Sequence, residues 1–167
     1  MTKVLYVEHN DDNLYMLKTR LELLGDFEVL VAEDSEKGCK LAVTERPDLI
    51  LMDLEMPIID RWEAVRRLKN DPQTHDIPII GMSAHALASE REKAIATGCD
   101  EFDAKPIEFE RLVATIRRVL ANPNKCSDRA ANQIQDQDGA PPIMRASLRV
   151  MARPSPVLPE NHIRAYL

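Results

Sequence analysis

The sequence has no apolar run that approaches the roughly 20 residues needed to cross a bilayer as a helix. Its first residues, Met1-Thr2-Lys3, lead directly into a predicted strand, so we expect no signal peptide. The apolar fraction of 44% and the charged fraction of 30% are typical of a soluble globular protein. We therefore expect a cytoplasmic protein without a membrane partner.

Cysteine and glycine are also scarce. The three cysteines, Cys39, Cys99 and Cys126, lie far apart, and none has the Cys-x-x-Cys spacing. Their odd number argues against a disulfide framework, and reduced thiols are the simplest interpretation. The five glycines form no glycine-rich phosphate loop, so a nucleotide is not the expected ligand.

Basic residues are too few in the first part of the chain to balance its acidic residues. Residues 1–120 hold 16 basic and 24 acidic residues, a net charge of −8, whereas the remaining residues carry a net +2. Direct binding to nucleic acid depends on cationic contacts with phosphates, which this acidic part does not favour. We expect protein partners instead.

The stretch around Asp53 organises the rest of the sequence. Leu49-Ile50-Leu51-Met52 is a continuous apolar run, typical of a strand buried on both faces of a parallel sheet. The run stops at Asp53, and Pro57 prevents further ladder pairing. Asp53 is thus predicted at the carboxyl end of a buried strand, where open α/β sheets place their ligand sites.

Strand-like and helix-like patterns alternate five times along residues 3–120. This alternation predicts an α/β fold: a doubly wound, five-stranded parallel sheet with right-handed crossovers and five helices covering both faces. The predicted strands are 3–7, 27–32, 48–53, 77–82 and 101–104, and the predicted helices are 14–24, 35–44, 62–69, 85–97 and 109–120.

The character of the sequence changes after residue 120. The last 47 residues hold six of the eleven prolines and show no sustained periodicity. We predict a domain over residues 1–121 and a flexible proline-rich tail over 122–167. Within the tail, Met144–Arg153 spaces three arginines four apart, so a short basic helix that docks on a partner or on the acidic domain is the alternative there.

Chemically useful side chains follow four of the predicted strands. Glu8 and His9 follow the first strand, Asp53 ends the third, Ser83 follows the fourth and Lys105 follows the fifth. Parallel strands deliver these residues to one edge of the sheet, although each alone is an ordinary loop residue. Together they suit phosphoryl chemistry: a carboxylate nucleophile, a hydroxyl, an ammonium and acidic groups that would hold Mg²⁺.

Residues 3–120 resemble a response regulator receiver domain of the CheY-like (flavodoxin-like) family, closest to its stand-alone DivK-like members. The motifs that carry the resemblance are Val7–Asn13, Asp48–Pro57, Ile77–Ala84 and Lys105-Pro106.

The resemblance implies roles for several residues. Asp53 matches the phosphoacceptor, charged from a phosphohistidine on a sensor histidine kinase or a phosphotransfer protein. Ser83 and Phe102 match the switch residues, and Lys105-Pro106 matches the conserved lysine and its cis peptide. Glu8, Asp53 and the main-chain carbonyl of Glu55 match the Mg²⁺ ligands. The resemblance also implies an output surface on the last two helices and the fifth strand, with a homodimer as an open alternative.

Two residues depart from the family pattern. His9 stands where the family has a second acid that ligates the metal directly, and an imidazole suits Mg²⁺ poorly. We therefore hypothesise that Mg²⁺ binding is weakened or shifted toward Mn²⁺ or Zn²⁺; a loop histidine without a metal role is the alternative. Arg61 stands where the family has glycine, and a left-handed turn there would cost roughly 1–2 kcal/mol.

The leading hypothesis is a single-domain response regulator of a two-component phosphorelay, which is not an enzyme beyond slow autodephosphorylation. An atypical receiver that is never phosphorylated and acts as a constitutive interaction module is the second hypothesis, favoured by His9 and Arg61. A phosphatase with an aspartyl nucleophile would need an Asp at position 55, and a flavin carrier would need a less acidic loop after the first strand.

Overall fold

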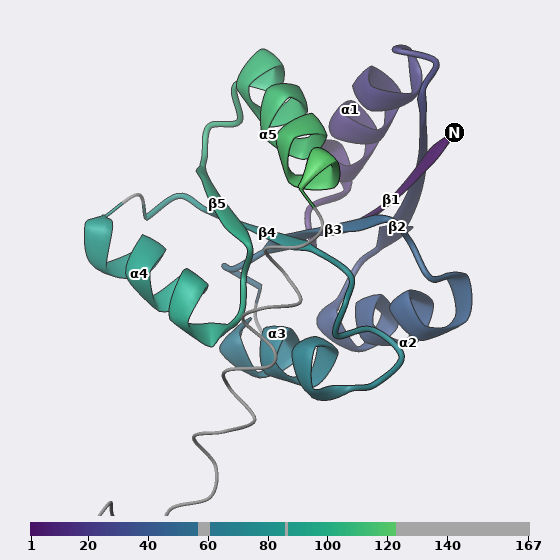
Figure 1. Cartoon of the computed structure of the whole chain (residues 1–167). Coiled ribbons are helices and arrows are strands. Elements are labelled where there is room, and N and C mark those ends of the chain that lie inside the picture. The colour runs from purple at the N-terminus through teal and green to yellow at the C-terminus, as the bar shows by residue number, and fades with distance from the viewer. Residues whose placement is uncertain (57–60, 86, 123–167) are drawn as a thin grey trace, which may run out of the picture. The chain divides into compact units, whose positions relative to one another are not determined.

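The computed structural model describes residues 1–56, 61–85 and 87–122 (Figure 1). The predicted flexible tail, including its Met144–Arg153 segment, lies outside the described residues apart from Asn122. Within the described part of the chain, no helix is long and apolar enough to cross a membrane.

A single five-stranded parallel sheet forms the centre of the domain, as predicted. Its strand order is β2-β1-β3-β4-β5, which places the apolar β3 in the middle with neighbours on both sides. All five residues of β3 are buried, which explains its lack of polar alternation. The strands are β1 (Thr2–Val7), β2 (Phe27–Ala32), β3 (Leu49–Asp53), β4 (Ile79–Ser83) and β5 (Glu101–Ala104).

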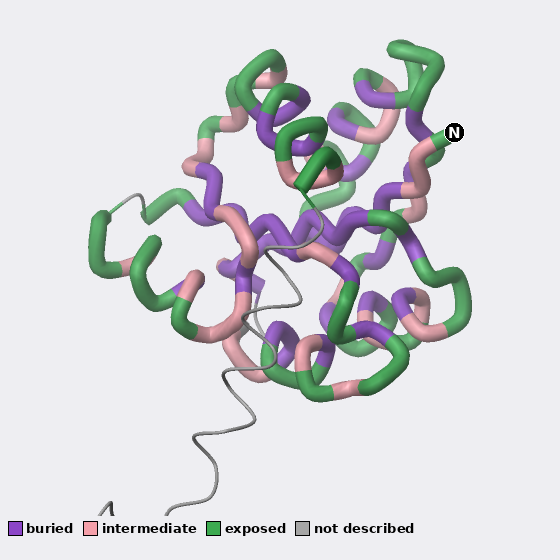
Figure 2. The backbone as a smooth tube through the Cα atoms, in the orientation of Figure 1, coloured by how far each residue is buried: buried purple, intermediate pink, exposed green. Residues whose placement is uncertain are grey.

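Five helices cover the two faces of the sheet. They are α1 (Asp11–Glu22), α2 (Ser35–Glu45), α3 (Arg61–Asn70), α4 (Ala88–Thr97) and α5 (Phe109–Ala121). Helices α1 and α5 lie on one face, and α2, α3 and α4 lie on the other (Figure 1). Each face has its own apolar core, and Figure 2 shows the buried strands between these two layers. The doubly wound fold class is therefore confirmed.

Side-chain caps begin two of the helices. The Asn10 side chain accepts a hydrogen bond from the Asn13 N–H at 3.0 Å, and Asp34 accepts one from the Lys37 N–H at 2.7 Å. Such caps satisfy N–H groups that have no partner within the helix. Asp34 is the N-cap of α2, and Asn10 turns the chain from the end of β1 directly into α1.

The structure corrects three predicted boundaries. Helix α1 ends at Glu22, so Leu24 does not continue its buried stripe and is 44% exposed. Strand β4 begins at Ile79 because Pro78 has no N–H to donate, although its carbonyl still accepts from Ile50. Helix α4 begins at Ala88 rather than at His85, and the N–H of His85 donates to the Ser83 hydroxyl at the end of β4.

Candidate functional site

The pairing of the strands brings the predicted site residues to one edge of the sheet. Asp53 is paired with Met82, so Ser83 lies one residue further along the neighbouring strand. Ser83 is in turn paired with Ala104 and its carbonyl accepts from the N–H of Lys105 at 2.9 Å. The parallel register, which the sequence predicted, thus aligns the ends of β3, β4 and β5.

Asp53 lies at the centre of the site and is fully buried. Its Oδ1 accepts a hydrogen bond from the Glu55 N–H at 3.0 Å and lies 3.1 Å from the Lys105 ammonium nitrogen. Its Oδ2 is also buried but has no hydrogen-bond partner among the described residues. Burying a carboxylate oxygen without a hydrogen bond is costly, and the nearest charged partner of Oδ2 is the His9 ring at 3.4 Å.

Glu8 is the second buried carboxylate, and several donors fix its position. Its Oε2 accepts from the Lys105 ammonium at 2.8 Å, from the Tyr6 hydroxyl at 3.2 Å and from the Asn13 side chain at 3.4 Å. Its Oε1 accepts from the Asn10 N–H at 3.1 Å. Lys105 therefore bridges the two carboxylates, as its position after β5 predicted.

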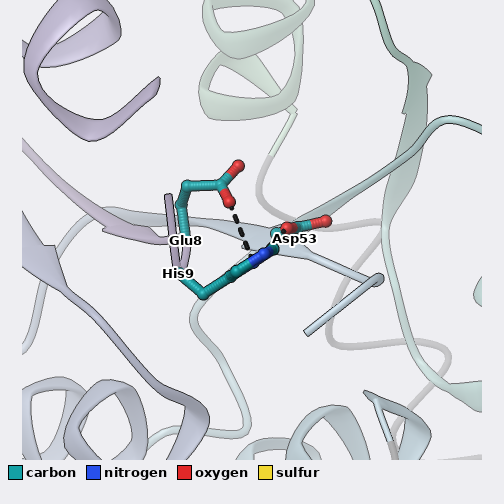
Figure 3. A group of neighbouring side chains, drawn as sticks. All are labelled: Glu8, His9 and Asp53. Atoms are coloured by element: carbon teal, nitrogen blue, oxygen red, sulfur yellow. Dashed lines mark ion pairs between the residues drawn. The ribbon is translucent and has the colours of Figure 1, made fainter. Parts of the chain in front are cut away.

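His9 lies against the same two carboxylates from the solvent side. Its Nδ1 is 3.2 Å from Glu8 Oε1 and 3.4 Å from Asp53 Oδ2 (Figure 3). The His9 side chain is 47% exposed, whereas both carboxylates are inaccessible. His9 and Lys105 thus contact different oxygens of the same pair of acids.

The protonation of the site follows from burial and these contacts. Burial raises the pKa of Asp53 above its ordinary range, and the charge of nearby Glu8 raises it further. Burial also acts against the charged form of Glu8, but hydrogen bonds from Lys105 and Asn10 outweigh it and hold the pKa of Glu8 below its ordinary range. The same carboxylates hold the pKa of Lys105 above its ordinary range despite burial. Glu8 and Lys105 are therefore both ionised at neutral pH.

Glu55 and His85 form a contact that the sequence did not predict. The Glu55 carboxylate lies 2.8 Å from His85 Nδ1, which joins the loop after β3 to the segment after β4. These residues are 30 positions apart, and their pairing depends on two loop conformations, for which the sequence carries no signal. The Glu55 side chain is thus engaged by His85, consistent with a metal role only for its main-chain carbonyl.

The remaining predicted residues also have defined places. Phe102 is buried in β5, within the core on the side of α3 and α4, and the Lys105–Pro106 peptide bond is cis. Asp11 lies in the exposed first turn of α1 and does not replace the acid missing at position 9. Arg61 is the first residue of α3, so its backbone is helical and the cost expected for a left-handed turn does not arise.

The donors present at the site fit a divalent cation. One side-chain atom each from Glu8, His9 and Asp53 lies within 4.8 Å of the other two. Asp53 Oδ2, which makes no hydrogen bond among the described residues, lies 3.4 Å from His9 Nδ1, so a cation beside these two atoms would supply a partner for a buried carboxylate oxygen. Two of the three donors are carboxylates, which hard cations prefer, and one is an imidazole.

Comparison with known proteins identifies the family. Residues 4–117 match the model of the response regulator receiver domain. The chain belongs to this family. It is therefore a receiver domain of two-component signalling, a phosphoacceptor type of domain rather than a member of an enzyme family.

Curated relatives match this chain over nearly their whole length. The chain is 32% identical over 119 residues to the polar-differentiation response regulator DivK of Brucella anthropi, covering 71% of this chain and 96% of the relative. It is also 32% identical over 123 residues to DivK of Brucella ovis, covering 73% and 99%. The part of this chain that resembles these proteins is the described domain.

Solved structures of receiver domains have the same fold. The chemotaxis protein CheY4 of Vibrio cholerae matches with a TM-score of 0.67 and 27% identity over 71% of this chain and 98% of that one. The receiver domain of a sensor histidine kinase from Pseudomonas aeruginosa matches with a TM-score of 0.66 and 29% identity over 72% and 98%. That structure contains a magnesium ion coordinated in its active site cleft.

Proposed function

We propose that this chain is a single-domain phosphoacceptor switch, with Asp53 as the residue that accepts the phosphoryl group. The observation that carries the proposal is the asymmetry of the Asp53 carboxylate. Oδ1 is held by Glu55 and Lys105, whereas the buried Oδ2 has no hydrogen-bond partner among the described residues. A buried carboxylate that is held at Oδ1 and has the half-exposed His9 ring 3.4 Å from Oδ2 is suited to nucleophilic attack on phosphorus.

The donor in this proposal is a phosphohistidine on a sensor histidine kinase or a phosphotransfer protein. The Asp53 carboxylate forms a bond to phosphorus, the bond from phosphorus to the donor's imidazole nitrogen breaks, and that nitrogen keeps the electron pair. Ser83 ends β4, and Lys105 directly follows β5. In this proposal the Lys105 ammonium neutralises one phosphoryl oxygen, and the Ser83 hydroxyl donates a hydrogen bond to another. A divalent cation held by Asp53, Glu8, His9 and the Glu55 carbonyl would supply further charge neutralisation.

The signal leaves the site, in this proposal, through Ser83 and Phe102 to α4, β5 and α5. Glu101 of β5 already joins these elements, since it accepts hydrogen bonds from Arg91 of α4 at 2.7 Å and from Arg118 of α5 at 2.8 Å. Phosphorylation would shift the population between two arrangements of this surface by the difference in its interactions with each. A downstream protein would bind one of the two arrangements.

The test is incubation of the full chain with acetyl phosphate and either Mg²⁺ or Mn²⁺, followed by intact-mass measurement. The proposal predicts a single phosphoryl adduct with at least one ion, and none in Asp53→Asn. Absence of an adduct with both ions, or an adduct that persists in Asp53→Asn, overturns it.

A constitutive interaction module is the second candidate. The observation that favours it is the position of His9, which covers the two carboxylates at 3.2 and 3.4 Å where the family has an acid. Under this alternative, the chain binds its partner with equal affinity before and after treatment with acetyl phosphate. The same adduct measurement therefore separates the two candidates.

A further inference from the structure

The spacing of His9 from its two acidic neighbours matches the spacing of ligands around one metal ion. Transition-metal bonds to nitrogen and oxygen are about 2.1 Å long, so two ligands separated by 90–110° around an ion lie roughly 3.0–3.4 Å apart. His9 Nδ1 lies 3.2 Å from Glu8 Oε1 and 3.4 Å from Asp53 Oδ2. Small adjustments of the half-exposed His9 ring are enough to place all three atoms on one ion.

A second observation points to a ligand at the same place. Asp53 is fully buried, and its Oδ2, one of the three atoms, has no hydrogen-bond partner among the described residues. Glu8, in contrast, is fixed by Lys105, Tyr6 and Asn10 and presents Oε1 toward His9. The cluster is thus a preorganised set of donors with one unsatisfied member.

The chemistry of this set differs from that of an all-acidic site. With His9 in place of an acid, two carboxylates face one ammonium, so the electrostatic attraction for a hard cation is reduced. Mg²⁺ gains little from an imidazole ligand, because it prefers oxygen and gives up its water reluctantly. First-row transition ions bind imidazole nitrogen readily, so their bond to His9 compensates for the weaker electrostatic attraction.

We propose that the cation of this site is a first-row transition ion of the Mn²⁺ or Zn²⁺ kind, bound by Asp53 Oδ2, Glu8 and His9, in preference to Mg²⁺. The proposal rests on the proposed function in placing the ion at the phosphoacceptor. Metal identity then regulates the site: phosphorylation of this receiver depends on the supply of an imidazole-binding ion rather than on the Mg²⁺ that is always abundant.

Calorimetric titration of the full chain with Mg²⁺, Mn²⁺ and Zn²⁺, each alone, tests the inference. We expect Mn²⁺ and Zn²⁺ to bind at least about tenfold more tightly than Mg²⁺, and the preference to be lost in His9→Asp. The matched control is His75→Asp, because His75 is also exposed but contacts only Pro72 in the loop after α3. His9→Gln is a second variant, in which Zn²⁺ binding falls while Mg²⁺ binding stays as in the wild type.

Two results would overturn the inference. One is wild-type affinity for Mg²⁺ equal to or greater than that for Mn²⁺ and Zn²⁺; the other is a change of preference in His9→Asp no larger than in His75→Asp. Paramagnetic broadening by Mn²⁺ provides an independent measurement, since the His9 ring signals must broaden before those of His75. Metal affinity requires no phosphoryl donor, so failure of this inference is distinguishable from failure of Asp53 to accept phosphate.

Discussion

Lys105 and Glu8 are 97 residues apart in the sequence, yet the ammonium of one donates to the buried carboxylate of the other at 2.8 Å. The contact is possible because β1 and β5 run parallel in one sheet and end at the same edge. Lys105 also lies 3.1 Å from Asp53, so one cation compensates two buried acids. The charge balance of the two buried carboxylates therefore depends on this one ammonium.

Lys105→Met should therefore destabilise the domain. The substitution leaves Glu8 and Asp53 buried without their shared cation, and breaking a buried ion pair costs about 3 kcal/mol of unfolding free energy. Denaturant unfolding measures the loss. The control is Lys40→Met, because the pair of Lys40 with Glu36 is exposed and screened by solvent, so its loss should change the unfolding free energy little. Equal losses in the two variants would contradict the account.

Gly38→Ala should also destabilise the domain, although alanine favours helices. A Cβ at position 38 would lie 2.8 Å from Cγ2 of Val7, where α2 packs on the end of β1. Overpacking of this kind costs about 1–3 kcal/mol, which exceeds the helix-propensity gain of about 1 kcal/mol. In a double-mutant cycle with Val7→Ala, unfolding free energies should show that the double variant loses less than the sum of the single losses. Additive losses would mean that Val7 is not the obstacle.

Ser83→Ala should slow phosphorylation of Asp53. Ser83 is fully buried at the end of β4, and its hydroxyl can donate a hydrogen bond to a phosphoryl oxygen on Asp53. Loss of one such donor costs about a hundredfold in rate. The time course of adduct formation from acetyl phosphate measures the effect, with Ser83→Thr as the variant that keeps a hydroxyl. A wild-type rate in Ser83→Ala would remove Ser83 from the mechanism.

The two described cysteines should differ in reactivity toward an alkylating reagent. Burial raises the pKa of Cys99 to about 12, so its thiol stays protonated when the pH rises from about 7 to about 9. Burial also raises the pKa of Cys39, but this residue is only partly buried, so its labelling should increase over the same interval. Peptide mass analysis follows each site. Labelling of Cys99 in the native protein at the rate of Cys39 would contradict the burial of Cys99.

Much of the fold follows from the sequence because its patterns are local. The apolar run before Asp53 reflects a strand that is buried on both faces of the sheet. The spacing of leucines in α1 reflects a helix that is buried on one face. The limits of elements were less well predicted where a tertiary contact decides them. Helix α4, for example, starts only at Ala88, after a segment in which the His85 side chain contacts Glu55 of another loop, a contact that no propensity describes.

The contacts of the site also fall into those that the sequence predicts and those that it does not. The meeting of Glu8, Asp53 and Lys105 follows from parallel strands, so the sequence was sufficient to predict it. The contact between Glu55 and His85 depends on the paths of two loops and could not be predicted. Nor could the sequence show that one oxygen of Asp53 accepts a hydrogen bond and the other accepts none among the described residues. This asymmetry arises from the direction of the Glu55 N–H.

The most direct test of the central claim is the location of the phosphoryl group. An aspartyl phosphate formed from acetyl phosphate is reduced by borohydride to homoserine, and peptide sequencing by mass spectrometry then places the change on one residue. The account predicts conversion at Asp53 alone. Conversion at Glu8 or Glu55 instead, or no conversion after treatment with Mg²⁺, Mn²⁺ and Zn²⁺ in turn, would contradict it.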